Sequence, residues 1–119
     1  MALNPSSEIR DVHGISDAEK DSIKAFMQGA VYCWVKNRKD EEFAVRDLVG
    51  GENYDWNRTP LQVLYEKHIN AGKNHDSSVE AAAKDLGWLV KAVLHEDKRT
   101  FEAGKTGLVN SYRWVGNEP

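Results

Sequence analysis

The stretch "RTFEAGKTGLVNSYRWV" (residues 99–115) decides the fold class that we predict for this chain. Two short segments with aromatic residues and alternating polarity flank a four-residue link, Gly104–Gly107, which begins and ends with glycine. This pattern is typical of a β-hairpin. Alternation along a strand predicts outward positions for Ser111 and Arg113. It predicts an inner face made of Phe101, Leu108, Tyr112 and Trp114.

The tripeptide Gly104-Lys105-Thr106 is also the sequence with which phosphate-binding loops end. Such a loop requires an earlier glycine, a strand before it and a helix after it, because the helix N-terminus holds the anion. Arg99 occupies the position of that earlier glycine, and the residues that follow are typical of a strand. We therefore interpret the stretch as a hairpin tip that presents Lys105 to solvent.

A first helix is predicted over residues 17–37. Ser16 and Glu19 have the spacing of a capping box, which marks a helix start. Apolar residues then recur at helical spacing, so one side of the helix is expected to be buried. That side consists of Ile23, Phe26, Met27, Ala30, Val31, Trp34 and Val35. Cys33 lies within the same helix and is interpreted as an inert packing residue.

Two further helices are predicted between this helix and the hairpin. Thr59-Pro60 marks the start of one, which Gly72 ends near residue 71. A capping turn that includes Asp76 precedes the other, over about 78–95. Its apolar spacing continues through Gly87, which favours one helix over a helix-turn-helix break at that glycine. Residues 42–46 fit a short strand and a helical turn almost equally well.

Length and composition indicate one soluble domain over residues 16–116, with a disordered lead-in over 1–15 and a tail over 117–119. The 119 residues include 16 Lys and Arg against 19 Asp and Glu, a formal net charge of −3. No apolar run reaches the roughly 18 residues of a membrane span, and the N-terminus has no apolar signal-peptide segment. With a single cysteine, Cys33, no disulfide is possible within the chain. A cytoplasmic location is the default expectation.

The sequence contains no recognisable catalytic or metal-binding pattern. The histidines are not spaced as on a zinc-binding helix, and no nucleophile elbow is present. His68 lies on the inward side of its helix and is interpreted as a core residue with satisfied hydrogen bonds. We therefore expect no metal, no cofactor and no enzymatic activity.

The predicted element order, a helix, a possible short strand, two helices and a hairpin, resembles the winged helix-turn-helix family over residues 16–115. The expected fold class is α+β and mostly helical, a three-helix core with a C-terminal β-hairpin. The resemblance implies binding of double-stranded DNA, with the third helix at the major groove and the hairpin beside it. On the third helix and just beyond it, the expected contacts are Lys84, Trp88, Lys91, His95 and Lys98. On the hairpin they are Arg99, Lys105 and Arg113.

An alternative function is protein–protein interaction or dimerisation by the same fold without DNA binding. The negative net charge and the possible exposure of Trp34, Trp56 and Trp88 favour it. The loop "GGENYDWNRTP" carries Tyr54, Trp56 and Arg58 and could bind a partner, although packing of Trp56 into the core is the favoured interpretation.

Overall fold

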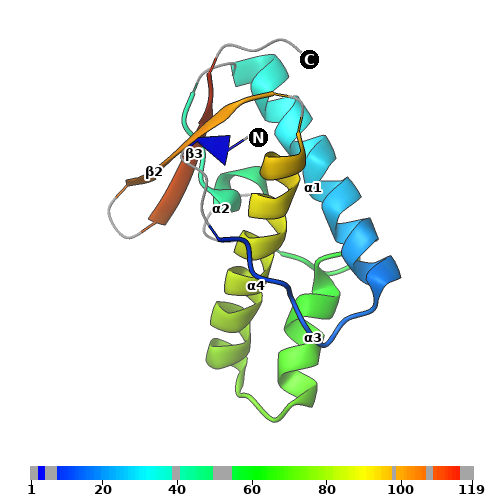
Figure 1. The fold of residues 1–119 in the computed structure, drawn as a ribbon. Coiled ribbons are helices and arrows are strands. Elements are labelled where there is room, and N and C mark those ends of the chain that lie inside the picture. Colours follow the sequence, from blue (N-terminus) through cyan, green and yellow to red (C-terminus); the bar gives the residue numbers. More distant parts are fainter. Residues whose placement is uncertain are drawn as a thin grey trace.

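The structure, a computed structural model, describes residues 3–4, 8–38, 41–49, 55–97, 99–106 and 109–115. It is α+β and mostly helical (Figure 1). In chain order the elements are β1 (Leu3–Asn4), α1 (Asp17–Arg38), α2 (Val45–Leu48), α3 (Gln62–Asn70), α4 (His75–Glu96), β2 (Phe101–Thr106) and β3 (Val109–Trp114). The predicted class of helices followed by a hairpin is confirmed at this level, and α2 is an additional single turn.

Helix α1 begins at the predicted capping box. The Glu19 amide donates to Ser16 Oγ at 3.1 Å, and the Ser16 amide donates to Glu19 Oε1 at 2.8 Å. Fewer residues of α1 are buried than predicted. The fully buried ones lie at every fourth position and form a single row along the helix. That row is Ile23, Met27, Val31 and Val35. Phe26 is 42% exposed, so its predicted burial is wrong.

Helices α3 and α4 are joined by a short turn at one end of the molecule (Figure 1). Gly72 has φ +98° and ends α3 as predicted, since glycine adopts this conformation at little cost. Helix α4 begins at His75, earlier than predicted, because Asn74 and not Asp76 is the N-cap. The Asn74 side chain accepts a hydrogen bond from the Ser77 amide at 2.8 Å.

The hairpin of β2 and β3 is antiparallel, with Phe101 opposite Trp114 and Thr106 opposite Val109. Gly104 is therefore part of β2, and the predicted four-residue tip is too long. The shorter connection, residues 107–108, includes Leu108 and lies outside the described residues. Ser111, predicted to point outward, is buried. Strand β1 adds a third, parallel strand beside β2.

Residues 42–46 contain both of the predicted alternatives. Phe43 forms an isolated antiparallel bridge to Tyr112 through two backbone hydrogen bonds of 2.8 Å, and the helical turn α2 follows. The Phe43 ring is fully buried and contacts the rings of Trp34, Phe101 and Tyr112. This residue therefore connects α1 to the hairpin through the core. Burial raises the pKa of the Tyr112 hydroxyl.

The N-terminal segment differs from the disordered lead-in that we predicted. Residues 8–15 run across α4 toward the start of α1 (Figure 1). Val12 is 2% exposed and belongs to the hydrophobic core. Asp11 accepts a hydrogen bond from Lys20 of α1 at 2.9 Å, and this contact holds the pKa of the Asp11 carboxyl below its usual range.

None of the helices in the described part of the chain has the length and apolar character of a membrane span.

Candidate nucleic-acid interface and apolar groove

The predicted DNA-binding side of α4 is only partly open to solvent. Lys84 is exposed and lies near Glu80, with Nζ 4.0 Å from Glu80 Oε1. Trp88, Lys91 and His95 lie on the same side of the helix but are half-buried. Lys84 is therefore the α4 cation that is most available to a phosphate.

The N-terminal segment covers the middle of this helical side. The Arg10 guanidinium lies 5.3 Å from the centroid of the Trp88 ring, and the Lys91 ammonium lies 5.2 Å from the same centroid. Lys91 also donates a hydrogen bond to the backbone oxygen of Glu8. The attraction of the Arg10 cation to the indole ring and the hydrogen bond from Lys91 to Glu8 together hold this segment against α4. No local sequence pattern predicts this role for Arg10, because its partner Trp88 is distant in the chain.

Arg99 is not available to a phosphate, in contrast to the prediction. Its side chain is 3% exposed, and its guanidinium donates to both carboxylate oxygens of Asp97 at 3.0 and 2.9 Å. The guanidinium also lies 4.2 Å from the centroid of the Tyr32 ring. Burial would raise the pKa of Asp97, but hydrogen bonds from Arg99 and Gln28 outweigh burial and hold this pKa below its usual range. Arg99 therefore has a structural role where α4 ends.

Arg113 is the hairpin cation whose side chain the structure describes as exposed. Arg113 is exposed and donates to Glu102 Oε1 at 3.0 Å across the two strands. The backbone of Lys105 lies in β2, but its side chain is outside the described residues, as is Lys98. Lys84 and Arg113 are thus the predicted cations that the structure describes as exposed.

In the described part of the predicted partner-binding loop, residues 55–60, the aromatic side chain is buried. Trp56 is 8% exposed and belongs to the core, which confirms the interpretation that it packs inside. Arg58 is exposed and has φ +63°, an uncommon conformation for a residue with a side chain. Tyr54 lies outside the described residues. Trp34 is half-buried, and its indole nitrogen donates to the Glu41 backbone oxygen at 3.0 Å.

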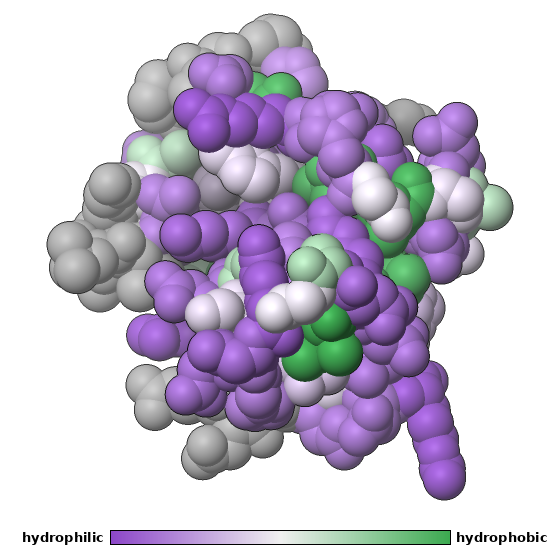
Figure 2. All heavy atoms as spheres, turned by 90° about the horizontal axis from the view of Figure 1, so that it is seen from below, coloured by the Kyte–Doolittle hydropathy of each residue, from purple (hydrophilic) through white to green (hydrophobic). Residues whose placement is uncertain are grey.

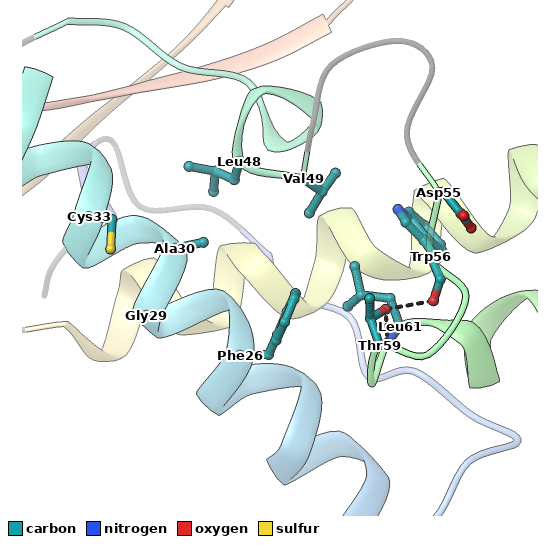
Figure 3. A pocket seen from close by; sticks show the side chains of 10 residues that line it. All are labelled: Phe26, Gly29, Ala30, Cys33, Leu48, Val49, Asp55, Trp56, Thr59 and Leu61. Carbon is teal, nitrogen blue, oxygen red and sulfur yellow. Dashed lines mark hydrogen bonds between the residues drawn. The ribbon is translucent and has the colours of Figure 1, made fainter.

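A groove beside α1 was not predicted (Figure 3). It has a volume of about 370 Å³ and is mainly apolar. Helix α1 contributes one wall, made of Phe26, Gly29, Ala30 and Cys33. The facing side is formed by Leu48, Val49, Asp55, Trp56, Thr59 and Leu61. We refer to this cavity as the α1 groove.

The Thr59 hydroxyl in the α1 groove is bound to the backbone on both sides. The Thr59 hydroxyl donates to the Trp56 backbone oxygen at 2.8 Å and accepts from the Leu61 amide at 3.1 Å. The thiol of Cys33 is exposed, so its predicted packing role is wrong. A sequence signal was available here: Gly29, Ala30 and Cys33 are small residues that share one side of α1 with Phe26, and small residues leave space beside a helix.

Other polar clusters have structural explanations. His68 Nε2 lies 2.8 Å from Asp85 Oδ2, and the Lys67 ammonium lies 2.9 Å from the same oxygen, so the predicted satisfied histidine is found. Among the residues that the structure describes, no group of three or more His, Cys, Asp or Glu side chains could hold a metal ion. No protein-family model, curated protein or solved structure matches this chain.

Proposed function

We propose that this chain is a small DNA-binding domain of the winged-helix type, in which α4 and the hairpin contact the duplex. The bridge between Phe43 and Tyr112 is the observation that carries the proposal. It joins the segment after α1 to the outer strand of the hairpin. Together with two helices joined by a short turn and a hairpin directly after the second, this is the arrangement by which such domains hold a reading helix and a wing.

The α3–α4 end of the molecule has a mainly hydrophilic surface, which supports this proposal. Seen from this end, the described residues are mainly hydrophilic, with small separate hydrophobic areas (Figure 2). The first half of α4 exposes the short or polar side chains of Ser77, Glu80, Ala83 and Lys84. Short side chains allow a helix to approach base edges closely, while a lysine contributes charge toward a phosphate.

The number of available cations limits the expected affinity. Lys84 and Arg113 are exposed, and Arg10 lies beside Trp88 near the same helix. Lys98 and Lys105 remain proposed contacts, while Arg99 is removed from the set because it is buried. With about three phosphates neutralised, the logarithm of the binding constant would fall with the logarithm of salt concentration at a slope of roughly −3.

Fluorescence anisotropy with a labelled duplex across a salt series tests this proposal. We expect Lys84→Glu and Arg113→Glu each to weaken binding about tenfold at low salt, because an attraction to phosphate becomes a repulsion. Arg38→Glu is the matched control, since Arg38 forms a comparable exposed ion pair with Glu41 at 3.2 Å at the end of α1. Undetectable binding at low salt, or equal losses in all three variants, would overturn the proposal.

The α1 groove favours a second function, protein–protein interaction without DNA binding. Phe26 is exposed beside an apolar cavity, which is typical of interaction surfaces. If this function replaced DNA binding, the anisotropy of the duplex would not change at any salt concentration. The chain would still bind a protein partner through the α1 groove.

A further inference from the structure

We propose that residues 8–10 form a hinged cover on α4, which turns about Asp11 and uncovers Trp88 and Lys91 when a duplex binds. In the closed position the cover shields the middle of the predicted DNA-binding side of α4, so the chain inhibits its own binding. This regulation presupposes the DNA binding proposed above.

The second half of the N-terminal segment, residues 11–15, is anchored to the body of the molecule. The segment crosses α4 and continues to the start of α1 (Figure 1). Val12 is buried, and Ile15 packs against the same hydrophobic core. Lys67 of α3 also donates a hydrogen bond to the backbone oxygen of His13. This half is therefore expected to stay in place when the cover moves.

The cover has no comparable anchor. Ile9 is half-buried and does not belong to the hydrophobic core. The described contacts between the cover and α4 are the Arg10 guanidinium beside the Trp88 ring and the hydrogen bond from Lys91 to the Glu8 backbone oxygen. The Arg10 and Glu8 side chains are both exposed, so these attractions are weak. A weakly held segment beside an anchored one opens locally while the fold stays intact.

The chain before the cover is also held by little pairing. Strand β1 pairs with β2 over two residues, Leu3 and Asn4, whereas strands usually comprise at least about three. We therefore expect β1 to leave the sheet when the cover opens. Asp11 is the expected turning point, because Lys20 of α1 binds its carboxylate.

The closed cover is incompatible with a reading helix in the major groove. That groove is about 12 Å wide, and a helix with its side chains is already about 10 to 12 Å across. With a second peptide segment lying on Trp88 and Lys91, α4 is too wide to enter. The cover also brings the exposed Glu8 carboxylate to this side of the helix, where it repels phosphate.

Opening exchanges one available cation for another. Arg10 moves away from α4, and the Lys91 ammonium is released from the Glu8 backbone oxygen. The number of neutralised phosphates therefore stays at about three, while the obstacle to the groove is removed. A duplex then binds the open form more tightly than the closed form, which is the condition for a ligand to shift such an equilibrium.

Duplex binding by Arg10→Gln tests the inhibition. We expect this variant to bind about three- to fivefold more tightly than wild type at low salt, because the open fraction limits the apparent affinity. Loss of an ordinary phosphate contact would have the opposite sign. Arg38→Gln is the matched control and should not tighten binding. The Arg38 guanidinium likewise lies 5.1 Å from an indole centroid, that of Trp34, and pairs with Glu41, but at the end of α1.

Proton NMR of the full chain tests the hinge without DNA. In the closed form, the ring current of Trp88 shifts the side-chain protons of Arg10 from their random-coil positions. In a urea titration below the unfolding transition, we expect this shift to disappear while the Val12 methyl signals keep their folded positions. An Arg10 shift that is absent without urea, or that disappears only together with the Val12 signals, would overturn the hinge.

The two experiments separate failure of the cover from failure of the proposed function. If the wild type binds the duplex and Arg10→Gln binds equally or more weakly, DNA binding stands and the inhibition is overturned. If neither protein binds the duplex at low salt, DNA binding itself is overturned, and the cover has no ligand to regulate. Tighter binding by Arg10→Gln together with a separate loss of the Arg10 shift supports both.

Discussion

Arg99 and Asp97 form a two-point ion pair where α4 ends and the hairpin begins. Nε and one terminal nitrogen of the guanidinium bind separate carboxylate oxygens at 3.0 and 2.9 Å, and both side chains are 3% exposed. Asp97 is also the C-cap of α4, and its carboxylate accepts the Arg99 amide. The pair therefore fixes the direction in which β2 leaves the helix.

Substitution of Arg99 by methionine should destabilise the fold strongly. The Asp97 carboxylate would stay buried without its counterion, which lowers the free energy of unfolding by about 3 kcal/mol. Arg113→Met is the control, because its pair with Glu102 is exposed and should contribute less than about 1 kcal/mol. Urea unfolding at neutral pH measures both, and similar losses in the two variants would show that burial of the Arg99 pair does not matter.

Asp97 should make stability depend on pH in the acid range. Its pKa is lower in the folded chain than in the unfolded one, so the carboxylate stabilises the fold above the unfolded-state pKa of about 3.9. This contribution is lost as the pH falls through the folded pKa. Asp97→Asn should thus be less stable than wild type at pH 7, with a difference that shrinks below about pH 4. Urea unfolding at several pH values checks this, and a constant difference would argue against it.

Two glycines should respond to alanine with opposite signs. Gly72 has φ +98°, so Gly72→Ala strains the end of α3 and lowers the free energy of unfolding by about 1 kcal/mol. Gly87 lies inside α4, and an added Cβ would meet no atom within 4 Å. Gly87→Ala should therefore raise stability by up to about 1 kcal/mol through helix propensity. Thermal unfolding of both variants is the measurement, and a shift of the same sign would be inconsistent with these local conformations.

The packing of the N-terminal segment can be tested at Val12. Val12→Ala should lower the free energy of unfolding by about 1 to 3 kcal/mol, because it leaves space in the core. His13→Ala should change stability by less than about 0.5 kcal/mol, since the adjacent His13 side chain is exposed. If both variants unfold like the wild type, the segment does not contribute to the core.

Local patterns predicted the features that depend on neighbours in sequence. The capping box of Ser16 and Glu19, the end of α3 at Gly72 and the continuity of α4 through Gly87 all follow from residues a few positions apart. The start of α4 was misplaced because Asn74 and Asp76 are both good caps, and the sequence does not rank them.

Features that depend on distant contacts could not be predicted. The apolar residues of the N-terminal segment, Ile9, Val12 and Ile15, are too few to establish a periodicity that would mark Val12 as buried. The winged-helix resemblance implied a phosphate contact for Arg99 on the hairpin, whereas its burial depends on Asp97 and the Tyr32 ring. The α1 groove could not be predicted because helical spacing places Phe26 on the buried side of α1, whereas the side chain is exposed and lines the groove.

The parallel pairing of β1 with β2 has a consequence for biosynthesis. Leu3 is synthesised before all of the helices, whereas Phe101, its neighbour in the sheet, is synthesised after them. The helices contain their own hydrogen bonds and can form during translation, but the bridge from Phe43 to Tyr112 must also wait for the hairpin. We expect sheet closure to follow release from the exit tunnel and to limit the rate of folding, because contacts between distant residues form slowly.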